Sequence, residues 1–250
     1  MFSTFSLSIP AIVYCCVVMV LAYSARGASG FGAAVAMPLL SLVIPLKLLI
    51  PAWTLIGIAA GVALFGSDRK KIAWNEIVRL VPGTLAGIGI GLYVFKQLDS
   101  ETLSKWLGVA VLLYGLYSLW GTFREAPKAH LPPKLAAALG GIGGGMTGTI
   151  VGTMGSVFFA MYFDAIRLGK DQYRATMTAI LLTLTLTRGV GYFSIGEFNW
   201  DVLVITAFLF PSMALGIFIG NRFHHGMSEL VFRRTVSGAL IASGLALLAK

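Results

Sequence analysis

Two glycine-rich stretches carry the residue types that could bind a ligand. The first contains Arg26, Ser29, Gly30 and Gly32, and the second contains Thr149, Gly152, Thr153, Gly155 and Ser156. Glycine permits sharp turns and close backbone approach, and Ser or Thr can cap a helix that begins there. A helix that begins inside a membrane exposes N–H groups and the positive end of its dipole, which suit a carboxylate, sulfate or phosphate.

Arg188 is a further candidate because it lies in an otherwise apolar and hydroxyl-rich stretch, 178–194. A charge at membrane depth is costly, so its side chain is expected to face protein or a water-filled cavity. A planar guanidinium can donate two parallel hydrogen bonds to an oxyanion. Snorkelling to the nearby interface is the alternative reading. Thr176, near the start of the same segment, is also a predicted site residue.

The glycines also have a structural explanation, which is tight packing between helices. For 140–145 we favour packing, whereas for the turns at 29–32 and 153–156 we favour binding. Neither stretch is a nucleotide loop, since no soluble strand precedes it and no P-loop lysine follows it.

Other catalytic or metal-binding patterns are missing from the sequence. The ten carboxylates all lie in loops or near segment ends, which argues against a cation transporter. The neighbouring Cys15 and Cys16 lie in an apolar run and predict neither a disulfide framework nor a metal site. We therefore expect no enzyme, no metal and no cofactor.

The composition determines the class of protein that must hold these residues. Of the 250 residues 57% are hydrophobic and 12% are charged, and the mean hydropathy is +0.86. Soluble domains carry about 25% charged residues, and disordered chains have low hydrophobicity. The sequence predicts an all-α, polytopic transmembrane helical bundle whose first apolar run is a retained span.

Ten apolar segments are expected along the chain. They cover 7–25, 30–44, 49–66, 77–96, 102–121, 134–151, 154–163, 175–195, 201–220 and 230–249. Two of them, 30–44 and 154–163, are short for a crossing, which needs roughly 20 residues. We interpret both as return arms of hairpins or broken helices packed inside protein, and leave open whether they cross fully.

The distribution of basic residues predicts the orientation. If sides alternate, one set of loops holds most of them: Arg69, Lys70, Lys71, Arg124, Lys128, Lys134, Arg167, Lys170, Arg174, Arg222, Arg233 and Arg234. The positive-inside rule places these loops in the cytoplasm and both termini outside. Most of the basic residues that give the chain its net charge of +9 then face the anionic cytoplasmic leaflet. Nucleic acid is excluded as a partner, because no basic face or stacking platform accompanies the charge.

A weak internal repeat divides the chain. Pro82, Gly87 and Gly91 form a pattern that recurs 129 residues later as Pro211, Gly216 and Gly220. We predict an N-terminal repeat at 1–122, a cytoplasmic linker at 123–133 and a C-terminal repeat at 134–250. With five segments each, the repeats would have opposite orientations, as in secondary transporters. The alternative is that Gly and Pro are simply common in membrane helices.

The glycine-rich stretch that leads to Pro38 resembles the start of the sulfite exporter TauE/SafE family of permeases. A second copy lies around 143–155 and is followed by Arg174, Ala175 and Thr176. The resemblance spans the chain, with fewer glycines in the first copy and more hydroxyls in the second. It implies an inner-membrane permease for sulfite or organosulfonates such as sulfoacetate.

Together the residues and the resemblance predict a secondary transporter that binds a small anion and moves it by alternating access. An anion channel on the same scaffold is the alternative, and a membrane-embedded enzyme is a weaker one. The transport direction, coupling ion and oligomeric state stay open.

Overall fold

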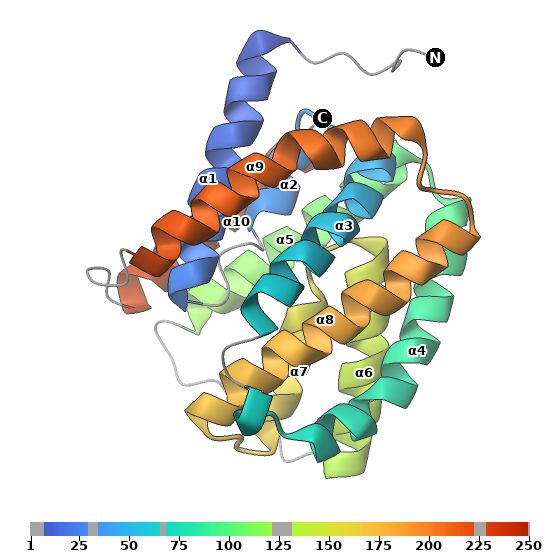
Figure 1. The fold of residues 1–250 in the computed structure, drawn as a ribbon, viewed down its shortest axis with the longest axis vertical. Coiled ribbons are helices and arrows are strands. Elements are labelled where there is room, and N and C mark those ends of the chain that lie inside the picture. Colours follow the sequence, from blue (N-terminus) through green and yellow to red (C-terminus); the bar gives the residue numbers. More distant parts are fainter. Residues whose placement is uncertain (1–7, 30–34, 66–68, 122–131, 223–228, 250) are drawn as a thin grey trace. The chain divides into compact units, whose positions relative to one another are not determined.

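The computed structural model describes residues 8–29, 35–65, 69–121, 132–222 and 229–249. These residues form helices and short connections, without a strand among them (Figure 1). The helices are α1 (Ile9–Ser29), α2 (Ala36–Ser41), α3 (Leu46–Phe65), α4 (Trp74–Gln97), α5 (Ser100–Trp120), α6 (Pro133–Ile150), α7 (Gly155–Ala165), α8 (Lys170–Ser194), α9 (Trp200–Arg222) and α10 (Glu229–Leu248), with a 3₁₀ turn η2 (Arg69–Lys71). The predicted all-α class is confirmed.

Four helices within the described ranges are long and apolar enough to cross a membrane. They contain the stretches Leu46–Ala63, Trp74–Gln97, Ser100–Trp120 and Trp200–Gly220. Two shorter apolar stretches, Ile9–Ser24 and Arg234–Leu248, accompany them. Since a span needs about 20 apolar residues, the chain is a polytopic helical membrane protein.

The two segments expected to be short form the shortest α-helices of the described chain. Helix α2 has 6 residues and α7 has 11 residues. At 1.5 Å per residue α7 is about 16 Å long, roughly half of a bilayer core of about 30 Å. Helix α7 is therefore too short to cross a bilayer by itself.

The chain forms two compact units, and each draws on both halves of the sequence. Unit 1 contains Met1–Leu49, Asp99–Pro127 and Leu203–Lys250, and unit 2 contains Ile50–Leu98 and Lys128–Val202. The predicted repeats are thus distinct from the units in which the helices pack.

In unit 2 the most extensive helix pair is α4 with α6, which run alongside one another (Figure 1). Glycines on α6 permit this approach: a Cβ added at Gly141 would lie 2.7 Å from Leu80 O and 3.0 Å from Thr84 N. On another face of α6, a Cβ at Gly144 would meet the Phe159 ring of α7 at 2.6 Å. The glycines between 140 and 145 therefore serve close helix packing, the reading that we favoured from the sequence.

In unit 1 helix α5 packs along α10, and α1 packs on α9. A Cβ at Gly216 of α9 would lie 2.7 Å from Val20 O of α1, and Ser24 Oγ donates to Gly216 O at 3.1 Å. Between α5 and α10, Ser237 Oγ donates to Ser118 Oγ at 2.9 Å. Small residues and hydroxyls at such contacts are the usual means of joining helices in a bilayer.

Candidate functional site

The second glycine-rich stretch contains a break between two helices of unit 2. Helix α6 ends at Ile150 and α7 begins at Gly155, so the break is confined to residues 151–154. Gly152 has a φ of +82°, which is a left-handed conformation that favours glycine. A Cβ at Gly155 would lie 2.6 Å from Gly144 O, so α7 also begins in close contact with α6.

Arg188 of α8 reaches this break and is only 2% exposed. Its Nη1 donates to the carbonyl oxygens of Gly148 and Gly152, the latter at 3.2 Å. The carbonyl groups in the last turn of a helix have no partner within the helix and form the negative end of its dipole. The positive charge of the guanidinium therefore stabilises the negative, C-terminal end of the α6 dipole.

Tyr192 lies one turn beyond Arg188 on α8 and acts on the same helix end. It is fully buried, and its hydroxyl donates to Thr149 O at 2.5 Å. Its ring also meets the Phe95 ring of α4 edge-on, with centroids 5.1 Å apart. Sequence reasoning missed Tyr192, although residues four apart on a helix share a face and this spacing could have pointed to it.

The hydroxyls of the break are held close to their own backbone. Thr149 is fully buried and its Oγ1 donates to Gly145 O at 2.7 Å. Ser156 Oγ is 3.5 Å from Thr153 O, a long hydrogen bond, and both side chains are half-buried. The structure thus brings together Thr149, Gly152, Thr153, Gly155, Ser156 and Arg188 of the predicted site.

The remaining predicted residues are placed elsewhere or lie outside the described chain. Arg26 and Ser29 belong to the last two turns of α1, in unit 1. Gly30 and Gly32 fall outside the described residues. Thr176 lies twelve residues before Arg188 on α8, about 18 Å along the helix axis.

Thr176 has a structural role, which is a hydrogen bond to the start of α4. It is fully buried, and its Oγ1 accepts the backbone N–H of Ala73 at 2.9 Å. Ala73 is the N-cap residue of α4 and makes no side-chain cap of its own. The Thr176 hydroxyl therefore ties the start of α4 to α8, and its distance from Arg188 separates it from the break.

We expect Thr176→Val to lower the melting temperature of the purified protein by roughly 2–8 °C, because a backbone N–H loses its acceptor. The matched control is Thr178→Val, since Thr178 Oγ1 bonds only Arg174 O of its own helix at 3.0 Å. That control should change the melting temperature by less than about 2 °C. Equal melting of the two variants would contradict the proposed tie between α8 and α4.

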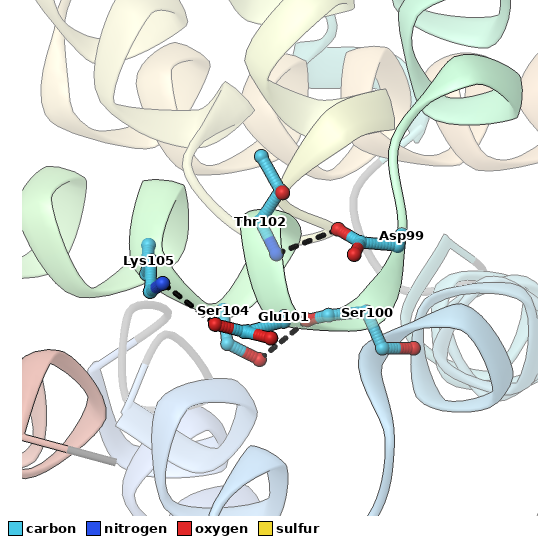
Figure 2. A network of polar contacts seen from close by, with 6 residues as sticks. All are labelled: Asp99, Ser100, Glu101, Thr102, Ser104 and Lys105. Atoms are coloured by element: carbon cyan, nitrogen blue, oxygen red, sulfur yellow. Dashed lines mark hydrogen bonds and ion pairs between the residues drawn. The ribbon is translucent and has the colours of Figure 1, made fainter.

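A second candidate site is a pocket of about 300 Å³ in unit 1, beside the start of α5. Its lining residues are Ser41, Val43, Pro45, Ser100, Glu101, Ser104, Lys105 and Leu247. Figure 2 shows its polar side, where Lys105 Nζ is 2.7 Å from Glu101 Oε1.

The charges at this pocket do not favour an anion. Asp99 caps α5 by accepting the N–H of Thr102 at 2.9 Å (Figure 2), and hydrogen bonds from the side chain and backbone of Thr102 lower the pKa of Asp99. The helix end is thus already satisfied by a carboxylate, and Lys105 is already paired with Glu101. The break beside Arg188 is the better candidate for an anion.

Within the described chain no group of three or more His, Cys, Asp or Glu side chains is arranged to hold a metal ion. The break itself contains hydroxyls, the first N–H groups of α7 and one buried positive charge. Such a set can bind an oxyanion.

Comparisons with known proteins agree on one type of protein. The sequence model of the family described as "Sulfite exporter TauE/SafE" matches residues 15–247. The "Probable inner membrane transporter protein TsaS" of Comamonas testosteroni is 26% identical over 207 residues, covering 77% of this chain and 80% of that protein. No solved structure matches significantly. The chain is a membrane transport protein and belongs to the TauE/SafE sulfite exporter family.

Proposed function

We propose that the protein carries a small sulfur-containing anion, sulfite or an organosulfonate such as sulfoacetate, across the inner membrane by alternating access. The observation that carries the proposal is the buried guanidinium of Arg188 at the break between α6 and α7. The family match and the relative described as an inner membrane transporter support the same class of substrate and location.

The break offers suitable groups to an oxyanion. The first N–H groups of α7, at Gly155 and Ser156, lie at the positive end of its dipole. The Thr153 and Ser156 hydroxyls are beside them, and Arg188 supplies full positive charge. Sulfite and sulfonates present three oxygen acceptors, so they can be bound by a helix end and a guanidinium together.

Contacts between α5 and α10 support the inverted repeat that alternating access would use. A Cβ at Gly115 would meet Ile241 Cγ1 at 2.9 Å, and a Cβ at Gly244 would meet Leu112 N at 3.0 Å. The two contacts correspond residue by residue, because Gly244 lies 129 residues after Gly115 and Ile241 lies 129 residues after Leu112. The two contacts follow one another in opposite directions along α5 and α10, so these helices are antiparallel. A two-fold axis in the membrane plane relates repeats of opposite orientation and accounts for this arrangement, whereas repeats of the same orientation would not.

The fourth helices of the two halves pack on corresponding partner helices. A Cβ at Gly87 of α4 would meet Met146 N of α6 at 2.8 Å, and one at Gly216 of α9 would meet Val20 O of α1 at 2.7 Å. Each half thus packs its fourth helix on the first helix of the other half. This exchange explains why each compact unit contains residues of both halves.

The proposal includes an orientation with both termini outside. It places the exposed basic turn of Arg69, Lys70 and Lys71 in the cytoplasm, as the positive-inside rule favours.

The test is reconstitution of the purified protein in liposomes on a solid-supported membrane. The outside solution is switched among sulfite, sulfoacetate, sulfate and chloride while charge movement is recorded. We expect a saturable response to sulfite or sulfoacetate that exceeds the response to chloride. Isotope counterflow covers electroneutral exchange, which this recording does not detect.

The same preparation distinguishes a carrier mechanism from a channel mechanism. Uptake that saturates and is accelerated by the same anion inside the vesicles supports a carrier, whereas unitary conductance steps in planar bilayers would favour the channel. Absence of both uptake and counterflow for every sulfur anion would overturn the proposed substrate class.

A further inference from the structure

We propose that the guanidinium of Arg188 occupies a cation site made by the C-terminal carbonyl groups of α6, and so serves as a tethered counterpart of a coupling ion. The inference deepens the proposed function, on which its consequence for transport rests. It assigns the protein a built-in cation at the break, so that anion transport needs no co-transported metal ion.

The first step is that two backbone carbonyl groups near the end of α6 accept hydrogen bonds from one nitrogen atom. Gly148 lies in the last turn of α6 and Gly152 lies beyond its end, yet both carbonyl oxygens accept from the same Nη1 of Arg188. The positive φ of Gly152 belongs to the turn that allows this. The neighbouring carbonyl of Thr149 accepts from Tyr192 at 2.5 Å. Side chains of α8 therefore donate to three carbonyl groups at or just beyond the end of α6, those of Gly148, Thr149 and Gly152.

The second step is that such an acceptor cluster suits a cation. In transporters with discontinuous helices, free carbonyl groups and helix C-termini coordinate Na⁺, while helix N-termini face the anionic part of the substrate. At this break a positively charged nitrogen lies where a metal ion would be coordinated. The N-terminus of α7 begins three residues after Gly152 and is the end suited to the anion.

The third step is energetic. Arg188 is 2% exposed, so its charge requires compensation inside the protein. Carbonyl groups at a buried helix end likewise require donors, and losing one costs free energy. The arginine and the carbonyl cluster therefore depend on each other. Removing the side chain should leave a cavity with the shape and charge preference of a guanidinium ion.

The experiment is a melting assay on purified Arg188→Ala in detergent with guanidinium chloride at concentrations too low to denature. We expect saturable stabilisation of this variant by roughly 2–4 °C, equivalent to about 1 kcal/mol. Sodium chloride and methylammonium chloride at the same concentrations control for ionic strength. The wild type, whose site already holds a guanidinium, should not be stabilised.

Arg69→Ala is the matched control, because Arg69 is exposed and its guanidinium lies over the Phe65 ring, 4.9 Å from the ring centroid. It removes an arginine without exposing a carbonyl cluster, so guanidinium should not stabilise it. Equal stabilisation of both variants, or none of Arg188→Ala, would overturn the inference. Should Arg188→Ala fail to fold, Arg188→Ser opens the same cavity, and its hydroxyl can bond its own helix as Thr183 and Thr185 do.

A transport measurement tests whether anion uptake needs a co-transported metal ion. Wild-type anion uptake should change less than twofold when Na⁺ is replaced by choline, and a strict Na⁺ requirement would overturn the tethered-cation role. The melting assay needs no transported substrate. If sulfur anions are not carried at all, the proposed function fails while the guanidinium site is still tested.

Discussion

Arg188→Ala is expected to reduce sulfur-anion flux at least about 100-fold. The substitution removes a buried positive charge and two charge-assisted hydrogen bonds to Gly148 and Gly152. A hydrogen bond to a charged group contributes about 1.5–3 kcal/mol, so the loss of two corresponds to about 3–6 kcal/mol, and each 1.4 kcal/mol corresponds to a factor of ten. Flux is measured per folded protein in liposomes, after size-exclusion chromatography has established that the variant is monodisperse.

Two further variants separate charge from structure. Arg188→Lys keeps the charge but replaces the planar fork by a single ammonium, so we expect intermediate flux. Tyr192→Phe removes the hydrogen bond to Thr149 O at the same helix end and keeps the charge. It should lower flux by less than about tenfold, since one neutral hydrogen bond contributes about 1 kcal/mol. Flux in folded Arg188→Ala equal to the wild type would remove Arg188 from the mechanism.

Gly87→Ala is expected to lower the melting temperature by roughly 2–12 °C, the effect of about 1–3 kcal/mol of overpacking. The new Cβ would lie 2.8 Å from Met146 N and 3.0 Å from the Ile142 carbonyl carbon, both of which are backbone atoms of α6. Backbone atoms cannot rotate away as a side-chain end can. The helices α4 and α6 would have to separate.

Gly89→Ala is the matched control, two residues along the same helix. A Cβ at Gly89 would have no atom within 4 Å, and the position is exposed. Alanine is the better helix former, so this variant should melt at or above the wild-type temperature. Gly216→Ala should behave like Gly87→Ala, because its Cβ would also meet backbone, at Val20 O. Indistinguishable melting of Gly87→Ala and Gly89→Ala would refute the packing argument.

Part of the candidate site could be predicted from residue type. Arg188 stood out because a charge in an apolar segment is costly, and Gly152 because a turn between helices favours glycine. Thr176 offers the same hydroxyl chemistry as Thr153 and Ser156, yet its hydroxyl caps α4. Residue type alone does not reveal which acceptor or donor a buried hydroxyl will meet.

The sequence by itself determined the all-α membrane class, the approximate segments and the two short ones. These follow from composition, apolar run length and glycine content, which act locally along the chain. Only the tertiary structure decided that Arg188 and Tyr192 bond the end of α6, and that each compact unit mixes both halves. Those contacts depend on how helices far apart in the sequence approach each other, because in a bilayer specific packing and hydrogen bonds select the neighbours.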